Sequence, residues 1–325
     1  MKVVSLFSGA GGFDLGFLKA GHEIVWASDI NKDCAETYRH NIGKHFVLAD
    51  IRDIPASLIP DCDIVIGGFP CQGFSQANRN RHLHDERNQL YQEFVRVVRE
   101  KKPKYFVAEN VRGLLSIGKG EAIRQIIHDF QNIGYRVDYR VFNAADFGVP
   151  QSRIRVIIIG VRNDVFSGQF PFPEPTHSRT GDLISKKWVT IGEALKNIPE
   201  PDDSHELKNH VYSKYKVTDR NFTGHRRTDP EKPSPTILAK DTGGNVATHH
   251  PKNHRRMSVR ESAVVQTFPL DFEFKGSLGS MYRQIGNAVA VLFAQKIGEA
   301  FKKIEAEPIQ RRIGIEKRIE TATSL

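Results

Sequence analysis

The chain of 325 residues has only three cysteines, Cys34, Cys62 and Cys71, and no Cys-x-x-Cys pair. Three cysteines are too few for a disulfide framework, and their spacing does not match a structural zinc site. The histidines at 249, 250 and 254 have no cysteine or acid beside them to complete a set of metal ligands. We therefore predict a reducing, cytoplasmic location and no bound metal.

Long apolar segments are also missing. No stretch approaches the roughly 20 apolar residues of a membrane span. Residues 1–6 run directly into a strand-like sequence without the pattern of a secretory leader. We find no internal repeat and no low-complexity tract. These absences predict a water-soluble protein without a membrane partner, and we expect it to be a monomer.

The chain has fewer acidic than basic residues. The 47 Lys and Arg residues against 38 Asp and Glu residues give a formal net charge of +9. An excess of this size suits a polyanionic partner, although part of it can be ordinary solubility charge. The hydrophobic content of 39% is enough for one large core or for a large and a small domain.

The first half of the chain alternates apolar runs with amphipathic segments. The segments predicted as buried strands are 2–7, 23–28, 45–48, 63–67, 104–108 and 155–161, and those predicted as helices are 31–41, 88–101 and 121–132. This alternation is typical of an α/β fold with a doubly wound, mostly parallel sheet, whose ligands bind at the carboxyl ends of the strands.

After residue 161 the alternation stops. Residues 162–254 are rich in Pro, His, Asn and Thr, and regular pattern returns only at 258–266 and 288–303. We predict a catalytic domain at 1–165, a smaller irregular domain at 166–280, a C-terminal helix at 281–305 that returns to the first domain, and a peripheral tail at 306–325.

A glycine-rich turn, residues 7–12, follows the first predicted strand and opens the first helix. Glycines there let a nucleotide-like ligand approach the backbone at a helix N-terminus, but such turns also serve dinucleotide enzymes and ordinary tight turns. Asp29 ends the second strand, where its carboxylate can accept hydrogen bonds from ribose hydroxyls. Asp50 ends the third strand, where its carboxylate can accept a hydrogen bond from an adenine amino group. Both aspartates can equally cap the following helices.

Cys71 follows Pro70 at the end of the apolar run 64–66, and Glu109 follows the strand-like run 105–108. A thiol at a strand-to-loop junction has a rigid backbone behind it and space in front, as a nucleophile requires. A buried small hydrophobe is the alternative for Cys71, and a helix cap or surface acid for Glu109. Neither alternative explains why Pro-Cys-Gln and Glu-Asn-Val occur at neighbouring strand ends.

Arg153 and Arg155 alternate with Ser152 and Ile154, so their side chains are predicted to project to the same side at the start of a strand. Paired guanidinium groups can clamp a phosphate or a carbonyl oxygen of a base. Ion pairs with Asp or Glu at the surface are the alternative.

Four blocks occur in a characteristic order: Gly67–Ser75, Glu109–Val111, Gln151–Arg155 and Gln284–Val289. In these blocks the chain, over about residues 1–305, resembles the DNA (cytosine-5)-methyltransferases, in their compact restriction-modification form. The resemblance implies a Rossmann-like methyltransferase fold, S-adenosylmethionine (AdoMet) as cosubstrate, and Arg153 and Arg155 facing the target cytosine. It implies an AdoMet pocket lined by Phe7, Gly9, Gly11, Gly12, Asp29, Ile30, Asp50, Ile51, Pro70, Leu90, Asn287 and Val289.

The chemistry of cytosine explains why a cysteine and a glutamate are paired in such an enzyme. Carbon C5 is a poor nucleophile, and addition of the Cys71 thiolate to C6 would convert the ring into an enamine that can attack the AdoMet methyl group. Glu109 would protonate or hydrogen-bond N3 of the ring, positioned by Asn110 and Val111. A base within a duplex is reached only after it is flipped into the pocket.

The resemblance also implies that duplex DNA is the partner and that 162–254 is the target-recognition region. Predicted DNA contacts are Ser75, Arg79 and Arg81 in the loop 72–88, Thr236 in a Thr-aliphatic element, and Arg226, Arg227, Arg255 and Arg256 in two His-Arg-Arg runs. A cognate restriction endonuclease acting separately is expected. Three alternatives remain: a tRNA-directed member of the family, a catalytically silent DNA-binding relative, and a nicotinamide dehydrogenase sharing the glycine-rich turn. The target sequence is not readable from spacing.

Overall fold

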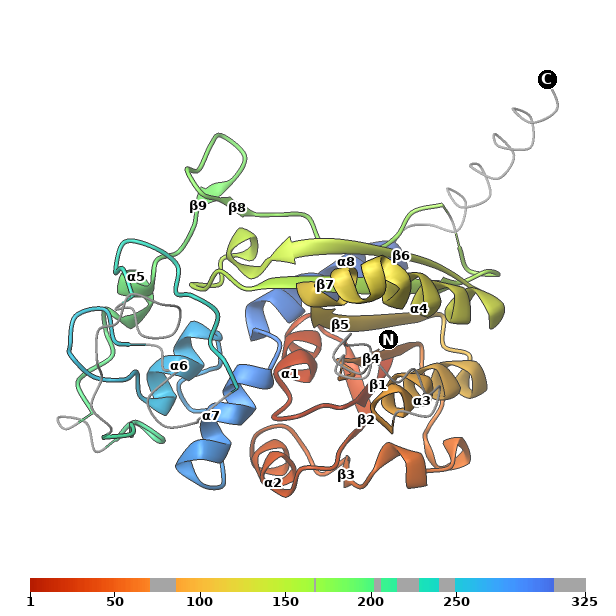
Figure 1. Ribbon diagram of the computed structural model, residues 1–325, viewed down its shortest axis with the longest axis horizontal. Coiled ribbons are helices and arrows are strands. Elements are labelled where there is room, and N and C mark those ends of the chain that lie inside the picture. The colour runs from red at the N-terminus through yellow and green to blue at the C-terminus, as the bar shows by residue number, and fades with distance from the viewer. Residues whose placement is uncertain (71–85, 167, 202–205, 215–227, 240–248, 307–325) are drawn as a thin grey trace.

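A seven-stranded sheet forms the centre of the larger part of the chain. The computed structural model describes residues 1–70, 86–166, 168–201, 206–214, 228–239 and 249–306 (Figure 1). The strands are β1 (Lys2–Leu6), β2 (Glu23–Asp29), β3 (Phe46–Leu48), β4 (Ile64–Gly67), β5 (Tyr105–Val111), β6 (Tyr135–Asn143) and β7 (Ile154–Arg162), with the short pair β8 (His177–Ser178) and β9 (Lys186–Lys187) outside the sheet.

The strand order is β3-β2-β1-β4-β5-β7-β6. Strands β3, β2, β1, β4 and β5 pair in parallel, whereas β7 pairs antiparallel with both β5 and β6. The order in which the chain adds strands reverses between β1 and β4: β2 and β3 follow on one side of β1, and β4 and β5 on the other. In open α/β sheets this switch point is where a crevice forms outside the carboxyl ends of the strands. The loops that follow β1, β2, β4 and β5 therefore meet at one edge.

The helices cover both faces of the sheet and also form a separate group. The α-helices are α1 (Gly12–Lys19), α2 (Lys32–Asn41), α3 (Glu86–Lys101), α4 (Glu121–Asn132), α5 (Ile191–Leu195), α6 (Val259–Val265), α7 (Leu278–Asn287) and α8 (Val291–Ala306), and the 3₁₀ helices are η1 (Ile51–Asp53), η2 (Ala56–Leu58), η4 (Arg112–Gly120) and η5 (Ala144–Phe147).

Alternate residues of the strands enter two different cores. Val3 and Val107 face a cluster with α1, α2 and α8, whereas Val4 and Phe106 face a cluster with α3 and α4. Strands buried on both faces read as continuous apolar runs, which is why the sequence pattern located them. Helix α8 lies against α1, where a Cβ atom on Gly16 would come within 2.3 Å of the Cβ of Ala294. Helix α8 thus brings the chain back to the seven-stranded sheet.

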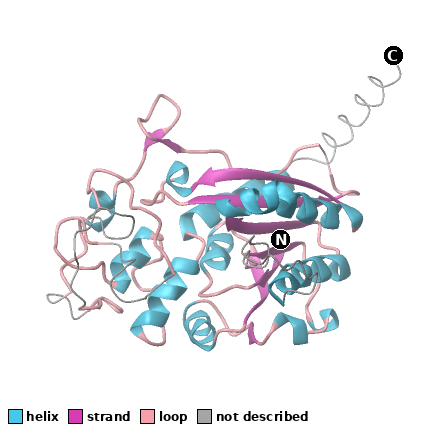
Figure 2. Cartoon of the chain, in the orientation of Figure 1, coloured by secondary structure: helices cyan, strands magenta, loops and turns pink. Residues whose placement is uncertain are grey.

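Helices α5, α6 and α7 form a third apolar cluster, which includes Leu195, Ile237 and Phe272. They lie beside the sheet, at the left of Figure 1, and Figure 2 shows that loops connect most of this part of the molecule. Among the described residues, no helix combines the length and apolar character needed to cross a membrane.

The predicted strands and helices of the first half are present with bounds shifted by a few residues, but β6, β8, β9 and α5 were not predicted, and the single helix predicted at 281–305 is divided into α7 and α8. Strand β6 carries the charged residues Arg136, Asp138 and Arg140 at alternate positions, because it lies at the edge of the sheet. Helix α7 contains two glycines and an asparagine, so its propensity is low. Its contacts with α6 supply the missing stabilisation.

Candidate active site

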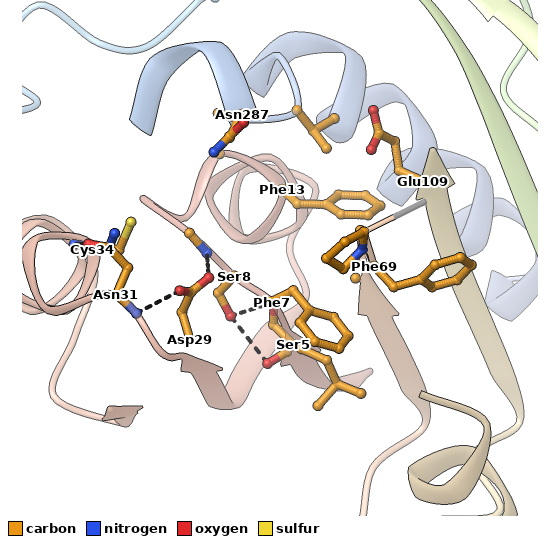
Figure 3. Close-up of a pocket in the computed structure, with 18 of the residues that line it drawn as sticks. Ser5, Phe7, Ser8, Phe13, Asp29, Asn31, Cys34, Phe69, Glu109 and Asn287 are labelled. Atoms are coloured by element: carbon orange, nitrogen blue, oxygen red, sulfur yellow. Dashed lines mark hydrogen bonds between the residues drawn. The ribbon is translucent and has the colours of Figure 1, made fainter. Parts of the chain in front are cut away.

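A cavity of about 620 Å³ opens at the carboxyl ends of β1, β2, β4 and β5 (Figure 3). Its volume lies within the usual range for small-molecule sites. The predicted cofactor residues that line it are Phe7, Gly9, Gly12, Asp29, Ile30, Asp50, Ile51, Pro70, Leu90, Asn287 and Val289. The wall also contains Glu109, Arg153 and Arg155. One cavity therefore joins residues that were predicted for two separate roles.

The turn after β1 is fixed to the end of β2. The Ser8 N–H donates to the carbonyl of Ser28 (2.9 Å), and the Gly9 N–H donates to Asp29 Oδ2 (2.9 Å; Figure 3). Phe7 and Gly9 both have positive φ, 55° and 54°. A positive φ is uncommon for a residue with a Cβ, so the turn at Phe7 is a constrained feature of the cavity wall.

Asp29 lies on the cavity wall at the end of β2, where an acceptor for hydrogen bonds from ribose hydroxyls is expected. Its Oδ1 accepts from the backbone N–H of Asn31 (2.9 Å), while Oδ2 accepts from Gly9. Two carboxylate oxygens offer about four acceptor positions, so these bonds orient the group and leave capacity for ligand hydroxyls. Burial raises the pKa of Asp29, because desolvation disfavours its charged form.

The two neighbouring glycines of the turn have different roles. A Cβ on Gly12 would lie 2.5 Å from the carbonyl oxygen of Val289, so glycine lets the turn approach the cavity wall after α7. A Cβ on Gly11, by contrast, would meet Ile42 and Tyr38 of the neighbouring helix at 2.2 and 2.9 Å. Gly11 does not line the cavity. Its predicted place in the pocket is corrected: it allows α2 to pack.

Asp50 is the N-cap of η1 and also lines the cavity. Its Oδ1 accepts from the backbone N–H of Arg52 (3.0 Å), and its Oδ2 lies 2.6 Å from Nη2 of the same arginine. The hydrogen bond from the Arg52 guanidinium lowers the pKa of Asp50. Asp50 is therefore an ionised acceptor at neutral pH, as a site for an amino group requires. It caps the helix as well, so the two sequence interpretations are compatible.

Glu109 and Arg155 form a buried ion pair on the cavity wall. Arg155 Nε lies 2.6 Å from Glu109 Oε1. Antiparallel pairing places Val111 opposite Arg155, so Glu109, two residues back along β5, is its diagonal neighbour on one face. A Cβ on Gly68 would lie 3.2 Å from Glu109 Oε2. The second carboxylate oxygen thus faces the segment that leads to Cys71.

Asn110 fixes the segment before Cys71 by a hydrogen bond. Its Nδ2 donates to the carbonyl of Phe69 (3.0 Å), and its Oδ1 accepts from the backbone N–H of Val111 (2.9 Å). The end of β5 is thereby tied to the chain two residues before Cys71. Cys71 itself lies outside the described residues, as do the predicted DNA contacts Ser75, Arg79, Arg81, Arg226 and Arg227.

Arg153 differs from its prediction. It precedes β7, is 3% exposed, and donates to three carbonyls of the protein: from Nη1 to Ile237 (3.1 Å), and from Nη2 to Gly286 (2.9 Å) and Ala288 (3.0 Å). Burial lowers its pKa to about 9, so it remains charged at neutral pH. The guanidinium binds backbone, where the sequence suggested a clamp on a phosphate or base.

The described residues of the predicted DNA surface are also engaged inside the protein. Arg255 is buried and its Nη2 lies 2.7 Å from Glu261 Oε1 and 3.0 Å from Glu200 Oε2. Arg256 is buried too, with its guanidinium over the ring of Tyr282. The interpretation of both as exposed DNA contacts is therefore corrected. Half-buried Thr236 donates to the carbonyl of Ser152 (2.9 Å).

Several residues of the cavity were not predicted from the sequence. They include Ser5, Ser8, Phe13, Cys34 and Arg283. Arg283 precedes Asn287 by four residues on α7, so both project to one side of that helix. Burial raises the pKa of the Cys34 thiol, which keeps it protonated and a poor nucleophile.

Asp14 of α1 lies fully buried beneath the glycine-rich turn. Its oxygens accept from the hydroxyls of Ser5 (3.0 Å) and Tyr38 (2.9 Å). Burial raises its pKa from 3.8 to about 6. Because the folded-state pKa is the higher one, this group stabilises the fold fully only below about pH 4, and that contribution is lost as the pH rises through about 6.

We expect Asp14→Asn to remove this dependence. Relative to the unaltered protein, the free energy of unfolding of the variant should rise by about 3 kcal/mol between pH 4 and pH 8, since one pKa unit corresponds to about 1.4 kcal/mol. Denaturant unfolding at several pH values measures this difference. Parallel stability curves for the two proteins would contradict it.

No cluster of three or more His, Cys, Asp or Glu side chains that could hold a metal ion occurs within the part of the chain that the structure describes. His250 instead accepts, through Nδ1, from the backbone N–H groups of Lys252 (3.3 Å) and Asn253 (3.0 Å).

Comparison with known proteins identifies the family. The model of the C-5 cytosine-specific DNA methylase family matches residues 1–303. The chain belongs to this family. It is a DNA (cytosine-5)-methyltransferase, as the sequence motifs predicted. It is 46% identical over 318 residues to the Type II methyltransferase M.NgoFVII of Neisseria gonorrhoeae, covering 89% of this chain and 83% of the relative. It is 38% identical over 355 residues to the Type II methyltransferase M.BspRI of Lysinibacillus sphaericus, covering 94% and 82%.

Solved structures share the fold of this methyltransferase. The S. pombe Dnmt2 methyltransferase superposes with a TM-score of 0.70 at 22% identity, covering 94% of this chain and 99% of that one. The Entamoeba histolytica methyltransferase EhMeth gives 0.66 at 17% identity with the same coverage. At these identities the likeness concerns the fold alone. It confirms the predicted α/β methyltransferase fold.

Proposed function

We propose that this methyltransferase transfers the methyl group of AdoMet to C5 of one cytosine within a short duplex DNA sequence, through a covalent Cys71–C6 adduct and base flipping. One observation carries the proposal. The predicted cofactor residues other than Gly11 line one cavity with the Glu109–Arg155 pair, at the strand ends from which the chain continues to Cys71.

The cavity suits AdoMet by its donors and acceptors. Asp29 and Asp50 are acidic acceptors at the ends of β2 and β3, placed for ribose hydroxyls and an adenine amino group. Ile51, Pro70 and Leu90 of the same cavity offer apolar surface to a purine ring. The turn at Gly9 presents backbone near the start of α1, where the methionyl part would lie. AdoMet supplies an electrophilic methyl group on a sulfonium.

Each residue of the catalytic end has a defined task. The Cys71 thiolate forms a bond to C6, and the ring electrons move toward N3, where Glu109 donates a proton or a hydrogen bond. Arg155 holds Glu109 in place and offers its remaining N–H groups to the ring carbonyl. Carbon C5 then takes the methyl group, and S-adenosylhomocysteine leaves. Loss of the C5 proton to solvent expels the Cys71 thiolate, and N3 returns its proton to Glu109, which restores the aromatic ring.

The second part of the chain supplies the DNA specificity in this proposal. The target base must leave the duplex to meet Cys71 and Glu109 from both faces of the ring. We assign target recognition to the region 166–280 and catalysis to 1–165, and we assign residues 281–305, which contain the end of α7 and most of α8, to the first domain. Host protection beside a separate restriction endonuclease, a cytoplasmic location and a monomer complete the proposal, and the Type II methyltransferase relatives support the first of these.

Bisulfite sequencing of DNA from cells that express the protein tests the function. We expect protection of one cytosine within a fixed short motif, and much less protection in cells that carry Glu109→Gln. Methylation at N4, or scattered sites without a motif, would refute the proposal.

A parallel assay of the purified protein on tRNA and on duplex DNA should give turnover on the duplex, whereas turnover on tRNA alone would favour the RNA-directed alternative.

A further inference from the structure

Three buried side chains meet where the cavity wall joins the second part of the chain. They are Gln151 and Arg153, before β7, and Gln266, after α6. Gln151 and Gln266 are both 0% exposed, and neither lines the cavity. Gln151 Nε2 donates to Gln266 Oε1 at 2.8 Å. We call Gln151, Arg153 and Gln266 the amide–guanidinium junction.

The junction ends helix α7. The last carbonyls of a helix have no partners within it and must be satisfied from elsewhere. Here Gln266 Nε2 donates to the carbonyls of Ile285 (2.7 Å) and Ala288 (3.2 Å), while Arg153 Nη2 donates to those of Gly286 and Ala288. A cation at this end also opposes the helix dipole. Side chains from distant segments thus fix where the helix stops.

The stop at α7 shapes the cofactor cavity. Residue 288, directly after the helix, is extended with ψ 147°. This turn leaves Asn287 on the cavity wall, as Figure 3 shows, and brings Val289 against Gly12. Movement of the helix end would displace both residues.

The same junction holds the predicted recognition region. The Ile237 N–H donates to Gln151 Oε1 (2.9 Å), and the Ile237 carbonyl accepts from Arg153 Nη1 (3.1 Å). The backbone of Leu238 and Ala239 packs directly on Gly286, where a Cβ would come within 2.4 Å of Ala239 N. The segment 237–239 is therefore held against the end of α7 both by hydrogen bonds from Gln151 and Arg153 and by direct packing on Gly286.

We propose that Gln266 and Gln151 are positioning residues, which set the Asn287–Val289 wall of the AdoMet cavity and lock it to the Ile237 segment. This inference rests on the proposed function, because it assigns that wall to AdoMet. Neither glutamine touches the ligand. Their effect on binding passes through the carbonyls of Ile285 and Ala288.

Isothermal titration with S-adenosylhomocysteine, together with methyl-transfer kinetics, tests the proposal in the full-length protein. Gln266→Met removes the amide donor from the carbonyls of Ile285 and Ala288 and leaves Gln151 Nε2 without its acceptor. It should raise the Kd about tenfold, since an unsatisfied buried polar group costs enough for such a factor. Gln266→Asn keeps the amide but shortens its reach, and should raise the Kd less. The KM for AdoMet should rise with kcat nearly unchanged, because the lost interaction is one of binding.

The recognition-side residue gives a second test. Gln151→Met should also raise the Kd, although its side chain bonds only Ile237 and Gln266. The double variant should bind no more weakly than the worse single variant, because the two glutamines act as one unit. Additive effects on the Kd would contradict the coupling.

Arg260→Met is the matched control. Arg260 is 0% exposed and donates to the carbonyls of Lys208, Pro269 and Phe272, away from the cavity. It should lower the melting temperature and leave the Kd unchanged. If both Gln266 variants likewise lose only stability, the junction is merely structural. If the unaltered protein does not bind S-adenosylhomocysteine at all, the cofactor assignment fails and this inference with it.

Discussion

Replacement of Cys71 by serine is expected to lower methyl transfer by on the order of 10³-fold or more, since a serine hydroxyl is far less ionised than a thiol near neutral pH. Duplex DNA with 5-fluorocytosine at the target should trap the unaltered enzyme covalently in the presence of AdoMet, because fluorine cannot leave as the C5 proton does. Cys71→Ser should form no such adduct, while its AdoMet affinity is retained. Denaturing gel shifts and mass spectrometry of the crosslinked peptide measure both outcomes.

Cys62→Ser is the control for this experiment. Cys62 is half-buried and does not line the cavity, and burial raises the pKa of its thiol to about 12, so it is not a thiolate at neutral pH. The variant should be trapped as the unaltered enzyme is. A crosslink found at Cys34 or Cys62 in the Cys71→Ser enzyme would overturn the assignment of the nucleophile.

Glu109→Gln is expected to slow methyl transfer by about 10²-fold or more, the usual contribution of a positioned acid. Glutamine can still accept a hydrogen bond from Arg155 but cannot supply a proton to N3. Binding of DNA and AdoMet should therefore persist while the rate of the chemical step falls. Single-turnover kinetics at saturating DNA isolate this step from binding and product release.

Glu93→Gln provides a matched control, because Glu93 Oε2 lies 2.6 Å from Arg96 Nε, the same length as the Glu109–Arg155 contact. This pair lies on α3, and neither residue lines the cavity. Loss of its charge should leave the single-turnover rate unchanged. Equal rates for Glu109→Gln and the unaltered enzyme would remove Glu109 from the mechanism.

The sequence alone determined the features that depend on local pattern. Strands buried on both faces are continuous apolar runs, so β1, β2, β4, β5 and β7 were located by composition. Motifs with fixed internal spacing follow such strands, which is why the sequence alone places Asp29, Asp50 and Glu109 at the ends of strands. Family membership followed from the same motifs, and the family match over residues 1–303 agrees.

Only the tertiary structure decided what the arginines do. A guanidinium that binds phosphate and one that satisfies buried carbonyls have the same sequence signature, because the partner comes from a distant part of the chain. Arg153 finds its carbonyls 84 to 135 residues away, and Arg255 finds Glu200 55 residues away. The pairing of Glu109 with Arg155 likewise depends on the antiparallel register of β5 and β7. Local pattern fixes which side chains stand at a strand end, whereas long-range packing fixes which groups they meet and so whether they face solvent, substrate or backbone.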